Sequence, residues 1–144
     1  MYIKIPKLSG SSVAGQFLRF SVVGTIAFAV NAGLVALLAP KIGPALGQMA
    51  AFPAATSVAW WLNRHYTFGA SHGSWHAEWS RYFSANVFGW LVNNGIFFGL
   101  IAISATAHRM PVLGVAAGSI AGLAFNFTAS RSMVFKTRKN PPLE

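Results

Sequence analysis

The chain has 144 residues, of which 54% are hydrophobic and 9% are charged, and its formal net charge is +9. A soluble domain carries about 25% charged residues, so this composition indicates an integral membrane protein. There is no cysteine, and the only acids are Glu78 and Glu144. Disulfides, thiolate metal sites and catalysis by paired carboxylates are therefore excluded.

Four stretches without Lys, Arg, Asp or Glu follow one another along the chain. Each reaches the roughly 20 residues that a helix needs to cross a hydrocarbon core. We therefore predict an all-α membrane protein that forms one domain over residues 1–144. The four transmembrane helices are predicted at residues 17–39, 45–63, 82–105 and 112–130.

Small residues recur at intervals of four in the second and fourth predicted helices, which places them on one face of each helix. Such faces let backbones approach closely in lipid, so we interpret them as packing seams. The second helix carries Gly47, Ala51 and Ala55, and the fourth carries Gly114, Gly118 and Gly122.

Residues 71–80, which read SHGSWHAEWS, are interpreted as a loop on the cytoplasmic side with Trp75 and Trp79 at the lipid head groups. His72, His76 and Glu78 are too few ligands for a zinc ion, which usually takes four. We therefore expect no metal site.

Positive charges lie mostly on one side of the predicted helices. Nine fall beside the two termini or between the second and third helices, whereas only Lys41 and Arg109 fall on the other side. Because positive charge concentrates on the cytoplasmic side, we predict that both termini are cytoplasmic.

Similar residues recur in the two halves of the chain, at offsets of 67 and 63 positions. The offset of 67 pairs Arg64 with Arg131, and the offset of 63 pairs Asn31 with Asn94. We interpret the chain as a duplicated two-helix hairpin, with both copies pointing the same way across the membrane.

Several motifs carry a resemblance to a known family: FSVVG at residues 20–24, Asn31 in the middle of the first helix, and NRHYTF at residues 63–68. Over residues 16–136 the chain resembles the GtrA-like family. The resemblance implies a multi-pass protein of the bacterial cytoplasmic membrane that is linked to moving polyprenyl-phosphate sugars. In the second half of the chain Ser130 precedes Arg131, whereas in the first half Asn63 precedes Arg64. We therefore expect the two helix ends to act unequally.

Arginines stand at the cytoplasmic ends of the four predicted helices, and a guanidinium fork fits a phosphate bidentately. The alternative is that they are anchors for ordinary anionic lipid. The residues that we predict to hold the phosphate of a lipid carrier are Arg64, Arg131, Arg19, Arg81, Trp60 and Asn63.

Asparagines lie deeper in the predicted membrane spans, where polar groups are costly and commonly mark a pathway. Asn86, Gly89 and Asn93 share one face by their spacing. The alternative is hydrogen bonding between helices. The predicted path for the sugar consists of Asn31, Asn94, Asn93, Asn86 and Asn126.

We predict that the protein translocates a polyprenyl-phosphate-linked monosaccharide and is not an enzyme. It has no Walker A sequence, and no acid falls inside a predicted span, so passive movement is favoured over ATP or proton coupling. The alternative is a non-transporting membrane anchor or regulatory subunit of a glycosyltransferase.

The expected partners are the lipid-linked sugar, membrane lipid and glycosyltransferases. A homo-oligomer is also expected, with the small-residue seams as candidate contacts between subunits, because four helices scarcely enclose a sugar and a phosphate. The positive charge flanks membrane spans instead of forming a separate domain, so neither nucleic acid nor a cofactor is expected.

Overall fold

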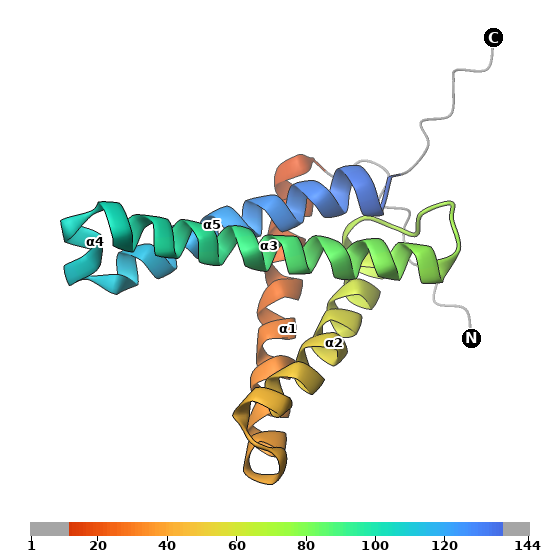
Figure 1. The fold of residues 1–144 in the computed structure, drawn as a ribbon. Helices are drawn as coiled ribbons and strands as arrows, with labels where there is room; N and C mark the ends of the chain where they lie inside the picture. The colour runs from red at the N-terminus through yellow and green to blue at the C-terminus, as the bar shows by residue number, and fades with distance from the viewer. Residues whose placement is uncertain (1–11, 137–144) are drawn as a thin grey trace.

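The computed structural model describes residues 12–136 of the chain. Every element in this part is helical, and the helices form two hairpins (Figure 1). The first hairpin packs α1 (Val13–Ile42) against α2 (Pro44–Leu62). The second hairpin packs α3 (Trp75–Ile103) against α5 (Pro111–Ala129).

Residues suited to helix ends delimit the first hairpin. The hydroxyl oxygen of Ser12 caps α1 by accepting a hydrogen bond from the amide of Gly15 at 3.2 Å. Gly43 has a φ of 85°, which few other residues adopt, and this turn ends α1. Pro44 then begins α2, where its missing amide proton costs nothing.

The second hairpin is delimited in a similar way. Ser74 caps α3, and Ser104 lies between α3 and the short α4 (Ala105–Arg109). Pro111 begins α5 as Pro44 begins α2.

The second helix of each hairpin ends in a π-helical turn. These turns are η1 (Asn63–Thr67) and η2 (Ser130–Val134). Each is closed by a backbone hydrogen bond across five residues, from Phe68 to Asn63 and from Phe135 to Ser130, both at 2.9 Å. Single π turns inside helices are frequent at functional sites.

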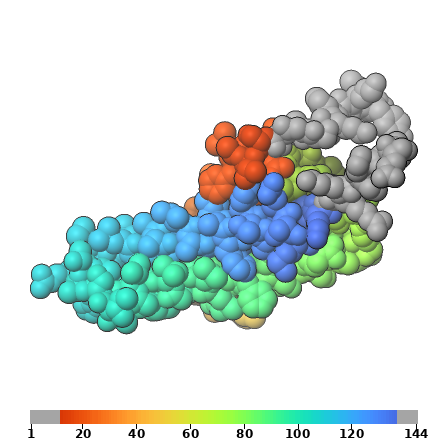
Figure 2. Space-filling model, turned by 90° about the horizontal axis from the view of Figure 1, so that it is seen from above, coloured from red at the N-terminus to blue at the C-terminus, as the bar shows by residue number. Residues whose placement is uncertain are grey.

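The two hairpins diverge from a common end, which we call the joint, and their tips point in different directions (Figure 1). The start of α1, η1, the start of α3 and η2 gather at the joint. Figure 2 shows the first turns of α1 against the C-terminal part of α5 and η2. The buried core lies here too, around Tyr82, Val134 and Phe135.

Three helical stretches in residues 12–136 are long and apolar enough to cross a membrane: Val13–Ile42, Trp75–Ile103 and Pro111–Val134. Large apolar side chains such as Phe28 and Ile103 point outward along them, as expected for helices that contact lipid. The protein is therefore a membrane protein with multiple apolar helices. α2 is not among these stretches, because residues such as Gln48 and Pro53 lower its hydropathy.

The cations in the described part gather near the joint, where Arg19, Arg64, Arg81, Arg131 and Lys136 are found. Lys41 and Arg109 instead lie at the hairpin tips, in the last turns of α1 and α4. The remaining basic residues used in the topology argument lie outside the described residues, and they are Lys4, Lys7, Arg138 and Lys139.

The small-residue stripes face the partner helix within each hairpin. A Cβ added at Gly118 would lie 2.5 Å from the backbone oxygen of Asn93 on α3, and one added at Gly114 would lie 3.0 Å from the ring of Phe97. A Cβ at Gly47 would lie 3.2 Å from the backbone nitrogen of Ala39 on α1. The glycines of the stripes therefore pack inside one chain, and contacts between subunits stay a prediction.

We expect Gly118→Leu to disrupt the second hairpin, because a larger side chain there pushes against the backbone of α3. Overpacking of this kind costs about 1–3 kcal/mol. Gly99→Leu is the matched control, since a Cβ at Gly99 meets nothing within 4 Å. Thermal unfolding in detergent is the measurement, and equal stability of the two variants would contradict the packing of this stripe.

Candidate functional site

A cavity of about 640 Å³ lies between the two hairpins and receives residues from α1, α2, α3 and α5. This volume falls in the range of about 300–1,000 Å³ that is typical of small-molecule sites. Five asparagines line it: Asn31, Asn63, Asn86, Asn93 and Asn126. Four of these residues are from the predicted sugar path, and the fifth, Asn63, was predicted to contact the phosphate.

Three of these asparagines present unpaired acceptors. The side-chain oxygens of Asn31, Asn63 and Asn126 are buried and have no hydrogen-bond partner within the described residues. Asn63 itself is only 1% exposed. A buried polar group without a partner costs about 1–3 kcal/mol, so a ligand that brings hydroxyl donors would be stabilised here.

In the part of the chain that the structure describes, the cavity lining contains no Asp, Glu, Lys, Arg or His. Hydroxyls of serine and threonine supplement the amides, among them Ser21, Thr56 and Ser119. The lining is therefore uncharged, with amides and hydroxyls set in a mostly apolar surface, and it suits an uncharged group that carries hydroxyls better than an ion.

Gly89 makes room for one of the unpaired amides. A Cβ added at Gly89 would overlap the side-chain amide of Asn126, which crosses from α5 toward α3. Gly89 is buried and lines the same cavity. The sequence placed Gly89 on a face with Asn86 and Asn93, but it did not indicate that the missing side chain accommodates Asn126.

Asn94 does not line the cavity, in contrast to its predicted role. Its side-chain nitrogen donates to the backbone oxygen of Trp90 at 2.8 Å, one turn back on α3. One helical residue is a rotation of about 100°, so Asn94 lies on a different face from Asn93. The pairing of Asn94 with Asn31 in the repeat therefore does not carry over to the cavity.

A group of polar contacts joins α2 and η1 to α3 beside this cavity, and Glu78 is at its centre. The Glu78 side chain is fully buried. Its Oε1 accepts hydrogen bonds from Arg64 Nη1 at 2.6 Å and from Trp60 Nε1 at 3.0 Å. Its Oε2 accepts one from the backbone amide of Ser71 at 2.6 Å.

Two further hydrogen bonds link the hairpins at the same place. Trp79 Nε1 on α3 donates to Ser57 Oγ on α2 at 3.0 Å, and Asn63 Nδ2 donates to the hydroxyl of Tyr82 at 2.9 Å. We call the seven side chains of these contacts the clasp: Ser57, Trp60, Asn63, Arg64, Glu78, Trp79 and Tyr82.

The prediction of a loop over residues 71–80 is wrong for its second half. α3 begins at Trp75, and the Ser74 hydroxyl caps it by accepting a hydrogen bond from Ala77 N at 3.3 Å. An N-terminal serine cap followed by an acid in the first turn favours a helix start. Glu78 is therefore a helical residue held by Arg64, and no acid in the described residues lies with enough partners to hold a metal ion.

The residues predicted to hold the phosphate are not all brought together. Three of them, Arg64, Trp60 and Asn63, belong to the clasp, and Asn63 also lines the cavity. Arg81 lies near Gly73, at the start of α3.

The last two members of that set make no hydrogen bond to the clasp within the described residues. Arg131 Nε donates to Gln16 Oε1 on α1 at 2.9 Å. Arg19 has a buried guanidinium nitrogen, Nη1, without a partner in the described part of the chain.

A scan against protein families finds one match over most of the chain. A family model described as GtrA/DPMS, transmembrane domain, matches residues 19–135. The matched segment contains both hairpins, the asparagine cavity and the clasp. No curated protein matches the chain.

Proposed function

The chain belongs to the GtrA/DPMS transmembrane domain family, and on that premise we propose that it translocates a polyprenyl-phosphate-linked monosaccharide across the bacterial cytoplasmic membrane. The observation that carries this proposal is the convergence of five asparagines on one uncharged cavity between apolar helices. The unpaired carbonyl oxygens of Asn31, Asn63 and Asn126 would accept hydrogen bonds from sugar hydroxyls.

The protein acts as a passive facilitator in this proposal and is not an enzyme. The sugar crosses beside the asparagine amides, which replace the water that its hydroxyls lose, while the isoprenoid tail stays in lipid. Synthesis of the lipid-linked sugar on one face of the membrane and its consumption on the other set the direction.

The two hairpins are, in this proposal, two copies of one unit that both cross the membrane from the joint. Support comes from the shared plan of α2 and α5, which both begin with proline and end in a π-helical turn. α2 crosses beside α1, against which it packs along its length. Both termini lie on the cytoplasmic side, where the cations of the joint are placed.

We expect a reagent added outside the cell to label Lys41→Cys and to leave His72→Cys unlabelled. The reason is that Lys41 lies at a hairpin tip and His72 at the joint, near the clustered cations. The natural chain has no cysteine, so either label reports on one position. Labelling of His72→Cys alone would reverse the proposed orientation.

Reconstitution tests the function itself. Liposomes that contain a defined polyprenyl-phosphate monosaccharide are treated with an impermeant reagent that oxidises sugar diols. Without protein the reagent consumes only the sugar of the outer leaflet, and with protein we expect it to consume the sugar of both leaflets.

The alternative function has its own outcome in this assay. If the protein leaves the inner-leaflet sugar untouched but binds a glycosyltransferase, it is a membrane anchor or regulatory subunit. Lipid-linked sugars of several kinds need to be tried, because the cavity lining has no charged residue that would select one uncharged sugar over another.

A further inference from the structure

Arg64 is a poor site for a ligand phosphate, because its charge is already compensated. Its Nη1 lies 2.6 Å from the buried Glu78 carboxylate, and its guanidinium lies over the Trp60 ring at 5.6 Å from the ring centroid. An arginine paired in this way attracts a second anion weakly. The phosphate of the proposed substrate must therefore be held elsewhere.

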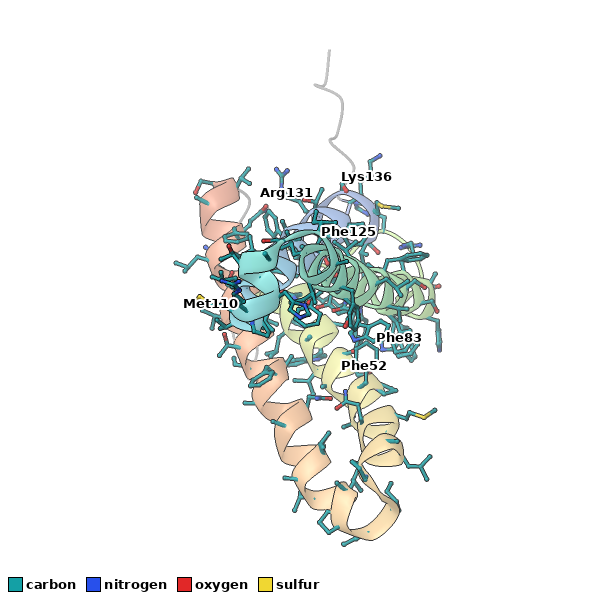
Figure 3. The ribbon with its side chains drawn as sticks, turned by 60° about the vertical axis from the view of Figure 1, so that its left-hand side comes forward. Phe52, Phe83, Met110, Phe125, Arg131 and Lys136 are labelled. Carbon is teal, nitrogen blue, oxygen red and sulfur yellow. The ribbon has the colours of Figure 1, made fainter. Side chains whose placement is uncertain are left out.

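A second, smaller pocket of about 260 Å³ lies where α1 meets η2. Among residues 12–136, the only charged residues in its lining are two cations, Arg131 and Lys136. Figure 3 shows both at the same end of the molecule, beyond the last turn of α5. The pocket therefore presents a local positive charge with no carboxylate among its lining residues.

The orientation of Arg131 is set by a contact with α1. Its Nε donates to Gln16 Oε1 at 2.9 Å, and the two terminal nitrogens of the guanidinium have no hydrogen-bond partner among residues 12–136. These nitrogens form the edge that binds a phosphate as a fork. Lys136 adds a second, more compact positive charge on the same pocket.

Phenylalanine rings connect this pocket with the asparagine cavity. Phe68 and Phe135, which line the small pocket, stack with ring centroids 5.2 Å apart and planes at 14°. Phe20, which lines the asparagine cavity, lies 5.9 Å from Phe68. These rings therefore run from one site to the other; Phe135 is buried, and the half-buried Phe68 presents a small apolar edge beside the cations.

We propose that the small pocket binds the phosphate of a prenyl phosphate, with Arg131 as the fork, Lys136 as the second cation and the half-buried Phe68 ring of the stack against the first isoprene unit. This inference rests on the proposed function, since it names where the lipid carrier docks at the joint before the sugar enters the asparagine cavity. Arg64 in this account positions the clasp and does not contact the phosphate.

Binding of farnesyl phosphate to the full chain in phosphatidylcholine nanodiscs tests the proposal. We expect the double variant Arg131→Gln, Lys136→Gln to bind about tenfold more weakly or worse, because charge-assisted hydrogen bonds are lost. The matched control is Lys41→Gln, Arg109→Gln, which removes the same charge from the hairpin tips and should bind like the parent. Equal weakening of both double variants would show an effect of net charge alone and overturn the site.

Two competition experiments distinguish a prenyl phosphate from other molecules that carry a phosphate. Inorganic phosphate should compete poorly, because it lacks the prenyl carbons that the ring stack would contact. Phosphatidylglycerol at the same mole fraction should also displace little farnesyl phosphate. Effective competition by either would overturn the assignment to a prenyl phosphate and leave a general phosphate or anionic lipid site.

The variant Arg131→Lys covers the case in which the double variant does not fold. It keeps the charge and loses the fork, so weaker binding with an unchanged elution volume on a sizing column is expected. Parent-like binding would contradict the fork.

Failure of this site and failure of the proposed function are distinguishable. If the protein moves lipid-linked sugar while the double variant binds farnesyl phosphate like the parent, translocation stands and the pocket assignment falls. If farnesyl phosphate binds through Arg131 and Lys136 but no sugar crosses, the pocket stands and translocation falls.

Discussion

Glu78→Ala is expected to cost about 3 kcal/mol or more in unfolding free energy, the range for breaking a buried ion pair. Glu78 is fully buried, and both of its oxygens accept hydrogen bonds. Its removal leaves Arg64, which is 21% exposed at its side chain, with an uncompensated charge, and frees the amide of Ser71. The two hairpins should then lose one of their connections at the joint.

A double-mutant cycle measures this effect in detergent solution. Glu78→Ala, Arg64→Ala and the double variant are compared by thermal unfolding or by titration with a denaturing detergent. We expect the double variant to be less destabilised than the sum of the two single variants, with a coupling of about 0.5–3 kcal/mol. Two small, additive effects would show that the ion pair does not hold the joint.

Asn126→Leu is expected to slow sugar translocation about fivefold, since one lost hydrogen bond to the crossing sugar is worth about 1 kcal/mol and about 1.36 kcal/mol is a factor of ten in rate. Leucine has a similar size but no carbonyl acceptor. Gly89→Ala should have a comparable effect, because its methyl group would occupy the place of the Asn126 amide. The initial rate at which inner-leaflet sugar reaches an outside reagent is the measurement.

The matched control for this prediction is Asn94→Leu, one residue beyond the cavity face. Its amide bonds to its own helix and does not line the cavity, so translocation should stay within about twofold of the parent. Stability is measured for every variant by elution and thermal unfolding. If Asn94→Leu were as slow as Asn126→Leu, the effect would reflect the helix and not the cavity.

Helical periodicity anticipated much of the cavity. The spacing of Asn86, Gly89 and Asn93 predicted a shared face, and that face lines the cavity. The comparison of the two halves of the chain was a poorer guide, because it matched Asn31 with Asn94. A repeat alignment fixes which residues correspond, whereas lining a cavity depends on a rotation of about 100° per residue.

The role of Glu78 was not predicted, because its partners lie far along the chain. Trp60 and Arg64 are 18 and 14 positions away from it, and no helical period links them. One signal was available: Glu78 is the only acid between the first and last helices, and it follows Ser74, a good helix cap. A single acid beside a partly buried arginine is a strong candidate for an ion pair.

The sequence pattern also did not predict the directions in which the two hairpins point. Small-residue stripes predict close packing of helix pairs, and in the structure the stripes pack against the other helix of the same hairpin. The relation between the pairs depends instead on the clasp and on contacts such as the one between Phe52 and Phe83 (Figure 3). The residues that make these contacts are not separated along the chain by a helical period, so periodicity cannot predict them.

The central claim is that the sugar of a lipid-linked monosaccharide passes through the asparagine cavity, and locating the sugar tests it most directly. A short-chain prenyl phosphate whose sugar carries a photoreactive diazirine is added to the reconstituted protein, and the crosslinked peptides are identified by mass spectrometry. We predict crosslinks within residues 82–93 and 119–126, with a reduced yield in Asn126→Leu and an unchanged yield in Asn94→Leu. Crosslinks confined to the hairpin tips around Lys41 and Arg109, or equal yields in both variants, would contradict the account.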